Sequence, residues 1–86
     1  MKILKFSTSK CIPCKNMKNV LLHYKMNHPS IEIEEIEDDF DRMSLLKIRT
    51  VPYLIIENND KKITHSGEIS YHEFCELVKP LEDEKS

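Results

Sequence analysis

The chain has 86 residues, of which 40% are hydrophobic and 33% are charged, and its formal net charge is −2. This length predicts one small domain with a modest core, because ordinary domains have about 100–150 residues. The longest apolar runs are only a few residues, which excludes a membrane-spanning segment, and an acidic balance without interleaved aromatic and basic residues argues against nucleic-acid binding. The first residues, Met1–Leu4, are too few and too soon charged for a secretory segment, so we expect a cytoplasmic protein.

The first half of the chain is predicted to form a strand, a helix and a second strand. Lys2–Phe6 has the composition of a short strand. From Cys11 onward, apolar residues at i, i+3, i+4 and i+7 predict an amphipathic helix, and Pro13 fits its first turn, where a missing N–H has no partner to lose. This apolar stripe consists of Met17, Val20, Leu21 and Tyr24. Residues 27–30 are expected to end the helix, and residues 31–37 to form the second strand.

A short helix and a hairpin are expected next. Apolar spacing suggests the short helix, which one of the preceding aspartates would cap. Its apolar residues are Phe40, Met43 and Leu46. The continuous apolar run Tyr53–Ile56 predicts a strand that is covered on both faces. A turn at residues 58–60 would join it to a return strand at residues 62–65.

A capping box predicts the start of the last helix. Ser70 stands at the cap position and Glu73 three residues later, before another apolar stripe with helical spacing. This stripe consists of Phe74, Leu77, Val78 and Leu81. Pro80 is expected to close the helix, which gives a domain over residues 1–81 and a charged tail over residues 82–86. The first strand–helix–strand unit should be parallel and right-handed, and the hairpin should add antiparallel strands to the same sheet.

Charge is segregated along the chain. Residues 1–30 carry six lysines and no acid, whereas residues 31–41 carry seven acids. Solvated faces on consecutive elements are the simpler interpretation of this pattern. The alternative is that Lys10, Lys15 and Lys18, which surround a pair of cysteines, favour the thiolate form of that pair.

The most informative motif is this pair, Cys11 and Cys14, which are separated by two residues at the predicted start of a helix. Such a pair can form and break an intramolecular disulfide, and a helix N-terminus favours the thiolate. We expect Cys11 to be the more exposed thiol and the nucleophile. Cys14, one turn deeper, would resolve a mixed disulfide by attacking Cys11. The alternative is a pair of unreactive helical cysteines.

The third cysteine, Cys75, has two interpretations, and an odd count of cysteines argues against a disulfide scaffold. A packed, unreactive thiol is the simpler one. The other joins His72 and Cys75 to Cys11 and Cys14 as a zinc ligand set, which requires the last helix to pass beside the cysteine end of the first. We expect neither a metal nor another cofactor.

The chain resembles the thioredoxin-like family in three features. These are the run Cys11–Lys15 at a helix start, the stretch Ile48–Tyr53 before a hydrophobic strand, and Gly67 before the last helix. The resemblance covers residues 1–81 and implies an α/β thioredoxin-like fold, with a four-stranded mixed sheet and three helices in the order β-α-β-α-β-β-α. It also implies a thiol–disulfide oxidoreductase, acting as a monomer, that reduces protein disulfides and is recharged by a reductase of the thioredoxin-reductase type or by a small thiol.

The same resemblance implies where a substrate would bind. Pro52 would be a cis proline packed against the cysteine pair, and the backbone of Val51 would offer hydrogen bonds to an extended substrate segment. Ile12 and Pro13, which lie between the cysteines, complete the expected substrate-binding residues. The sequence by itself indicates only that Val51 is extended, because a proline follows it.

Two branches of the family share features with this chain. The stretch Thr50–Pro52 is glutaredoxin-like, whereas Pro13 directly before Cys14, and Lys15 after it, are thioredoxin-like. Glutaredoxins typically grip glutathione with two glycines followed by paired acids, and the corresponding stretch Ser66–Ser70 has one glycine and one acid. A glutathione-linked reductase and a non-catalytic binding module are therefore the alternatives to a reductase of protein disulfides.

The residues around the cysteines depart from the thioredoxin pattern. Lys10 and Ile12 stand where that family usually has tryptophan and glycine, and Lys5 stands where it keeps a buried aspartate that helps to move a proton. A lysine cannot serve as a carboxylate, so the resolving step would use water or an acid from the strand over residues 31–37. We expect Lys5, Lys10 and Lys15 to modulate the cysteine pair.

Overall fold

A computed structural model describes residues 1–82 and confirms the predicted order of elements. The elements are β1 (Lys2–Ser7), α1 (Ile12–Asn27), β2 (Glu32–Glu37), α2 (Phe40–Leu45), β3 (Tyr53–Asn58), β4 (Lys61–Ser66) and α3 (Tyr71–Glu82). None of the helices in this part of the chain combines the length and apolar character that a membrane crossing requires.

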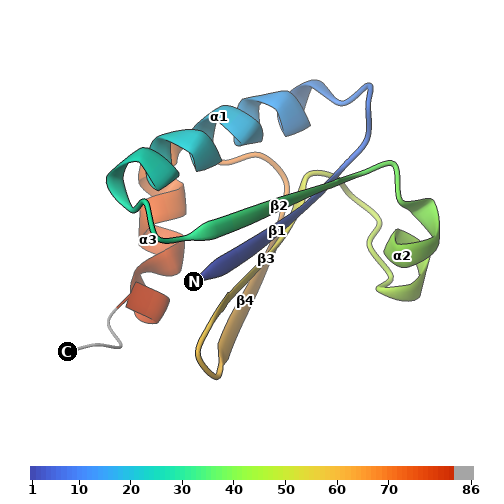
Figure 1. Ribbon diagram of the computed structural model, residues 1–86. Coiled ribbons are helices and arrows are strands. Elements are labelled where there is room, and N and C mark those ends of the chain that lie inside the picture. Colours follow the sequence, from blue (N-terminus) through green and yellow to red (C-terminus); the bar gives the residue numbers. More distant parts are fainter. Residues whose placement is uncertain (83–86) are drawn as a thin grey trace.

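The strands form one mixed sheet in the order β2-β1-β3-β4 (Figure 1). β1 and β2 are parallel, β1 and β3 are antiparallel, and the β3–β4 hairpin is antiparallel, as predicted. Because β1 and β2 run in the same direction, the segments that follow them leave the sheet at the same edge. The segment before β3 lies at that edge too, since Phe6 of β1 pairs with Tyr53 at the start of β3.

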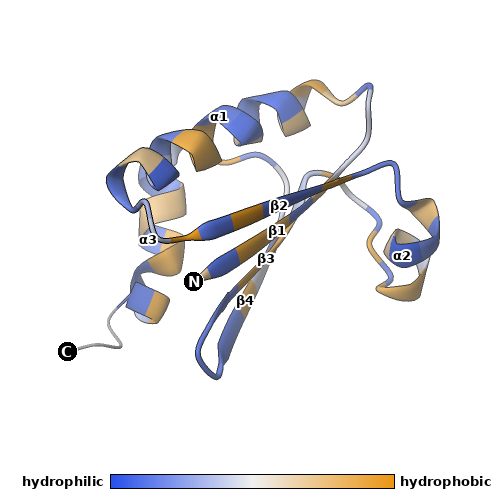
Figure 2. Cartoon of the chain, in the orientation of Figure 1, coloured by the Kyte–Doolittle hydropathy of each residue, from blue (hydrophilic) through white to orange (hydrophobic). Residues whose placement is uncertain are grey.

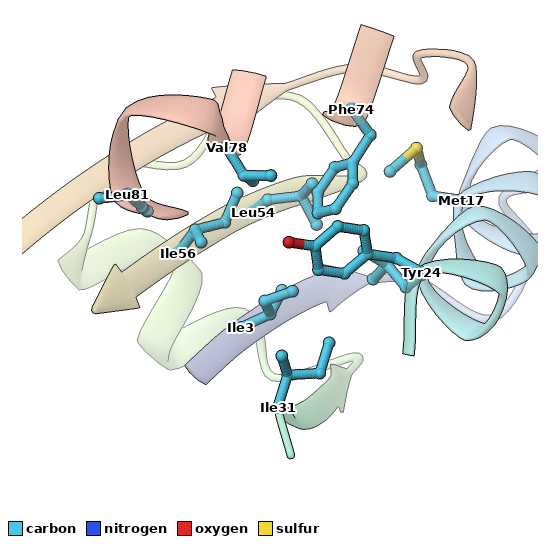
Figure 3. Packing of buried hydrophobic residues seen from close by; sticks show 10 residues of the cluster. Ile3, Met17, Tyr24, Ile31, Leu54, Ile56, Phe74, Val78 and Leu81 are labelled. Carbon is cyan, nitrogen blue, oxygen red and sulfur yellow. The ribbon is translucent and has the colours of Figure 1, made fainter. Parts of the chain in front are cut away.

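The main core lies between the sheet and the two long helices, α1 and α3. Side chains alternate across a strand, so Ile3 of β1 and Leu54 and Ile56 of β3 point to the same face, and all three are fully buried. Both helices present their predicted stripes to this face, as Figure 2 shows by the alternation of hydrophobic and hydrophilic segments along α1. At the centre of this core the rings of Tyr24 and Phe74 meet edge to face, with their centroids 5.0 Å apart (Figure 3).

A smaller core covers the opposite face of the sheet. Its buried members are Phe6, Ile36, Met43, Ile48 and Ile55. The short helix α2 supplies Met43 and begins at the predicted aspartate cap, where the Asp39 side chain accepts a hydrogen bond from the Arg42 N–H. The other two apolar residues that predicted α2, Phe40 and Leu46, are exposed. A single buried side chain therefore attaches this helix to the sheet.

The end of α3 corrects one prediction. Pro80 lies inside the helix, which continues through Glu82, so the predicted tail overlaps the helix by one residue; residues 83–86 of that tail lie outside the described part of the chain. Pro80 is on the exposed side, where water can hydrate the carbonyl that loses its partner. Tertiary contacts hold the last turn instead: Leu81 is buried, Asn58 donates to the Leu81 carbonyl, and the Tyr24 hydroxyl donates to Glu82.

The capping box at the start of α3 forms as predicted. The Glu73 N–H donates to the Ser70 hydroxyl at 3.1 Å, and the Ser70 N–H donates to the Glu73 carboxylate at 3.0 Å. These bonds, the one from the Ser70 backbone first, hold the pKa of Glu73 below its ordinary value of 4.5. Because the folded-state pKa is the lower one, this contribution to stability is present above pH 4.5 and is lost as the pH falls through the folded-state pKa.

Replacing the cap is expected to weaken the fold measurably. The substitution Ser70→Ala removes the hydroxyl acceptor and should cost about 1 kcal/mol, which corresponds to a decrease of roughly 4–8 °C in Tm for a domain of this size. Thermal unfolding followed by circular dichroism would measure it. Ser44→Ala, at an exposed position inside α2, is the matched control and should leave Tm nearly unchanged. Equal effects of the two substitutions would contradict the capping role.

Candidate active site

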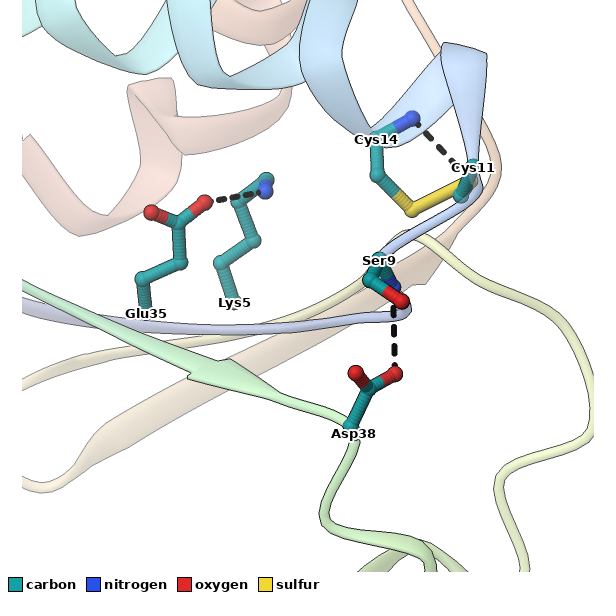
Figure 4. The surroundings of a disulfide bond; sticks show 6 residues. All are labelled: Lys5, Ser9, Cys11, Cys14, Glu35 and Asp38. Atoms are coloured by element: carbon teal, nitrogen blue, oxygen red, sulfur yellow. Dashed lines mark hydrogen bonds and ion pairs between the residues drawn. A yellow bond between two sulfur atoms is a disulfide. The ribbon is translucent and has the colours of Figure 1, made fainter.

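Cys11 and Cys14 form a disulfide at the start of α1 (Figure 4). Cys11 is the N-cap residue with an extended backbone, and Cys14 lies in the first helical turn. This places the two Cα atoms 5.2 Å apart, within the range that a disulfide spans. The Cys14 N–H donates to the Cys11 sulfur at 3.1 Å, so the cap sulfur receives a backbone donor of the helix N-terminus.

The two cysteines differ in exposure, as predicted. Cys14 is 2% exposed because it lies on the apolar face of α1, three residues before buried Met17. Cys11 precedes the helix and is half-buried, and its neighbours Ile12 and Pro13 are exposed. The pair therefore has one accessible sulfur and one that the protein shields.

The loop before Cys11 is tied to the end of β2 by a residue that the sequence analysis did not select. Asp38 accepts a hydrogen bond from the Ser9 N–H at 3.0 Å (Figure 4). The Asp38 N–H donates to the Ser7 carbonyl at 2.9 Å. An acid directly after a strand commonly accepts from nearby backbone N–H groups, which is the signal that could have identified it. These bonds fix the path of the chain between β1 and the cysteine pair.

Charged side chains lie in two places at this site: around the disulfide, and on the sheet beneath α1. Lys10 and Lys15 flank the disulfide and are exposed, and the first turn of α1 carries no acid. Lys5, by contrast, is buried beneath α1, and its Nζ lies 2.7 Å from Glu35 Oε2. Of the acids that the sequence left open on β2, Glu35 is the one that pairs with Lys5, because the parallel register sets these two residues side by side.

The Val51–Pro52 step lies at the same edge of the sheet as the cysteines, since it precedes the start of β3. Its peptide bond is cis, as the resemblance implied, and Pro52 is buried. The Pro52 carbonyl accepts from the Gly67 N–H at 2.8 Å. Gly67 has φ +97°, a conformation that side chains disfavour, so the chain's one glycine stands where the backbone needs it. Contact between these residues and a substrate stays a prediction.

The zinc interpretation finds no ligand set in residues 1–82, where no three His, Cys, Asp or Glu side chains are placed to share a metal ion. Cys11 and Cys14 are joined to each other, and Cys75 packs against the main core near Tyr24. Tyr24 lies ten residues after Cys14, which is about 15 Å along a helix at 1.5 Å per residue. The last helix therefore crosses the first at its far end, away from the disulfide.

Comparison with known proteins adds a family and a fold. Residues 3–61 match the family model described as glutaredoxin. A search of curated protein sequences finds no match.

Among solved structures, the chain is similar to chloroplastic thioredoxin z at 21% identity, with a TM-score of 0.84 over 94% of this chain and 77% of that one. It is also similar to a malarial protein (13% identity, TM-score 0.81, 93% and 94% of the two chains). A third is thioredoxin O2 from Arabidopsis thaliana in its oxidized state (18% identity, TM-score 0.77, 93% and 73%). At these identities the likeness establishes the thioredoxin-like fold.

Proposed function

The chain belongs to the glutaredoxin family, and we propose that it is a thiol–disulfide oxidoreductase that reduces protein disulfides through Cys11 and Cys14. The observation that carries this proposal is the asymmetric disulfide at the N-terminus of α1, with one accessible sulfur and one shielded sulfur. A pair that only stabilised the fold would close a loop of two residues, which restricts an unfolded chain very little. A redox couple needs this arrangement, because the attacking thiol must meet a substrate and the resolving thiol must not.

The proposed reaction begins with the reduced pair. The Cys11 thiolate attacks the substrate disulfide, forming a bond to one substrate sulfur and releasing the other as a thiolate. The Cys14 thiolate then attacks Cys11, which forms the Cys11–Cys14 disulfide and releases the second substrate thiolate. Both substrate thiolates take up protons. The substrate is thereby reduced by two electrons and the pair is oxidised, and an external thiol must reduce it again.

Protein disulfides fit the surface beside Cys11 better than a small charged thiol does. Ile12 is 69% exposed, and Pro13 next to it is exposed as well, which offers an apolar surface to an extended segment. Val51 and Pro52, at the same edge, would line the other side of the substrate. The Gly67 N–H, in the stretch that would grip glutathione, is already used by the Pro52 carbonyl.

A glutathione-linked reductase is the second candidate, and the glutaredoxin family match favours it. The two candidates differ in what recharges the disulfide, glutathione in one case and a reductase of the thioredoxin-reductase type in the other. For either one we propose a monomer that acts in the cytoplasm. A binding module that uses the fold without turnover is the third possibility that an activity assay must address.

Reduction of insulin disulfides tests the proposal directly. In the presence of dithiothreitol the protein should accelerate insulin precipitation well above the rate with dithiothreitol alone. Substituting Cys75, which lies outside the disulfide, by serine should preserve this rate and serves as the control. A rate equal to the background would contradict the oxidoreductase proposal and leave the binding module. Repeating the assay with glutathione and glutathione reductase in place of dithiothreitol would separate the two recharging routes.

A further inference from the structure

Lys5 is buried to an extent that is unusual for a lysine. It is 2% exposed, and within residues 1–82 the only other buried polar residue is Ser7. Lysine is almost never fully buried unless it is paired, because its ammonium loses hydration. Replacing a whole buried ion pair by apolar side chains of similar volume is often neutral or favourable for stability. Folding therefore does not require an ion pair here.

The pairing of Lys5 is asymmetric. Its Nζ lies 2.7 Å from Glu35 Oε2, and the two residues are direct neighbours in the parallel register of β1 and β2. The Glu35 side chain is 36% exposed, and its second oxygen lies 4.0 Å from Lys18 Nζ. Water can therefore reach the carboxylate but hardly reaches the ammonium. The field of Lys5 is screened less than the field of its partner.

Lys5 and Cys14 line the same cavity, which has a volume of about 170 Å³. Figure 4 shows the Lys5 side chain rising from β1 toward α1, while the Cys14 side chain points down from α1 toward the sheet. The other charged residues around this cavity are Lys15 and Lys18 of α1 and Glu35 and Glu37 of β2. All four are exposed or partly exposed, so Lys5 is the one charge of the cavity that solvent does not screen.

Cys14 needs such a charge when it resolves a mixed disulfide. The attack on Cys11 requires the thiolate of Cys14, and burial at 2% exposure disfavours a thiolate because it removes water from the charged form. The neighbouring apolar side chains of α1 offer no compensation. A buried ammonium that shares the cavity does.

We propose that Lys5 is a positioning residue for the resolving step, whose buried ammonium stabilises the thiolate of Cys14, and that Glu35 holds this ammonium in the cavity. The inference rests on the proposed dithiol–disulfide function. Cys14 loses its proton to solvent and attacks Cys11, the Cys11–substrate bond breaks, and the departing substrate sulfur keeps the electron pair and takes up a proton. Lys5 keeps its proton throughout and acts on the reaction through Cys14.

The first test measures the Cys14 thiolate without any substrate. In the variant with Cys11→Ser and Cys75→Ser, Cys14 is the only thiol, and its ionisation can be followed by the ultraviolet absorbance of the thiolate. Adding Lys5→Met should raise the midpoint of this titration by about one pH unit. Lys2→Met is the matched control, because Lys2 lies on the same strand and also pairs with an acid of β2, Glu34. It should leave the midpoint unchanged.

Glu35→Gln provides an independent variant at a partly exposed position. It removes the negative charge that offsets Lys5 and keeps an amide oxygen that can still accept a hydrogen bond from Lys5 Nζ, so the midpoint should move in the opposite direction, downward. An unchanged midpoint in Lys5→Met, or shifts of the same sign in Lys5→Met and Glu35→Gln, would overturn the proposal. If Lys5→Met does not fold, an unchanged or higher midpoint in Glu35→Gln would overturn the proposal.

The second test measures the resolving step itself. The reduced Cys75→Ser protein is mixed with the disulfide of thionitrobenzoate, and release of the second thionitrobenzoate reports the attack of Cys14 on Cys11. Lys5→Met should slow this release about tenfold at neutral pH, while the first release, which depends on Cys11, changes little. Equal slowing of both releases would indicate a general structural effect and contradict the proposal. If Lys5→Met shifts the midpoint of the Cys14 titration but the unsubstituted protein does not reduce insulin, the proposed role of Lys5 stands and protein disulfides are rejected as the substrate class.

Discussion

Replacing Cys11 by serine is expected to reduce the insulin-reductase rate to that of dithiothreitol alone. Cys11 is the accessible sulfur at the N-terminus of α1, and it receives the Cys14 N–H as a hydrogen-bond donor. A serine hydroxyl keeps the size and the capping acceptor, but it does not ionise at neutral pH and cannot form a disulfide. The fold should therefore remain while the reaction stops, and circular dichroism together with the insulin assay would measure both.

Substitution of the second cysteine gives the complementary result. Cys14→Ser should retain attack by Cys11 and lose resolution, so a mixed disulfide between Cys11 and the substrate should accumulate. Mass spectrometry under non-reducing conditions would detect this mixed disulfide, and dithiothreitol should reduce it and release the substrate. Accumulation in Cys11→Ser instead of Cys14→Ser would reverse the proposed roles of the two sulfurs.

Phe74→Ala is expected to have the largest effect on stability. Phe74 is fully buried on α3 and meets the ring of Tyr24 edge to face at the centre of the main core. Removing a buried phenylalanine ring costs about 3–5 kcal/mol, because the transfer energy is lost and a cavity remains. Domains are stable by only about 5–15 kcal/mol, and an 86-residue chain lies toward the lower end of that range. Urea unfolding should show a protein that has lost a large part of its stability.

Phe40→Ala is the matched control for this substitution. It removes the same ring from α2, where Phe40 is 61% exposed, and it should change the free energy of unfolding by about 0.5 kcal/mol or less. Losses of equal size at the two positions would mean that the core is not organised around α1 and α3.

The order of elements could be predicted from the sequence because it depends on local patterns. The stripe of α1 and the capping box of Ser70 and Glu73 act within a few residues, and the structure forms both. The asymmetry of the cysteine pair follows from the same helical geometry, since three residues carry Cys14 onto the buried face. The exposure of Phe40 and Leu46 was not predictable in this way, because spacing does not reveal how much sheet a short helix can cover.

Contacts between distant segments escaped the sequence analysis. Pro80 was expected to end α3, but the bonds from Asn58 and Tyr24 to the residues that follow it hold the last turn in place. Asp38 fixes the loop before the cysteines through Ser9, which is 29 residues away in the chain. None of these three contacts leaves a periodic pattern in the sequence.

The sequence by itself determined the cysteine pair and the elements that carry it, because helix and strand periodicity, proline and the spacing of Cys11 and Cys14 are local properties. Only the tertiary structure decided the surroundings of Cys14. The parallel register of β1 and β2 set Glu35 beside Lys5, and the packing of α1 over β1 buried the Lys5 side chain in the cavity of Cys14. The interaction energy between two charges depends on the distance between them and on their exposure to water, and both are defined only once the chain has folded.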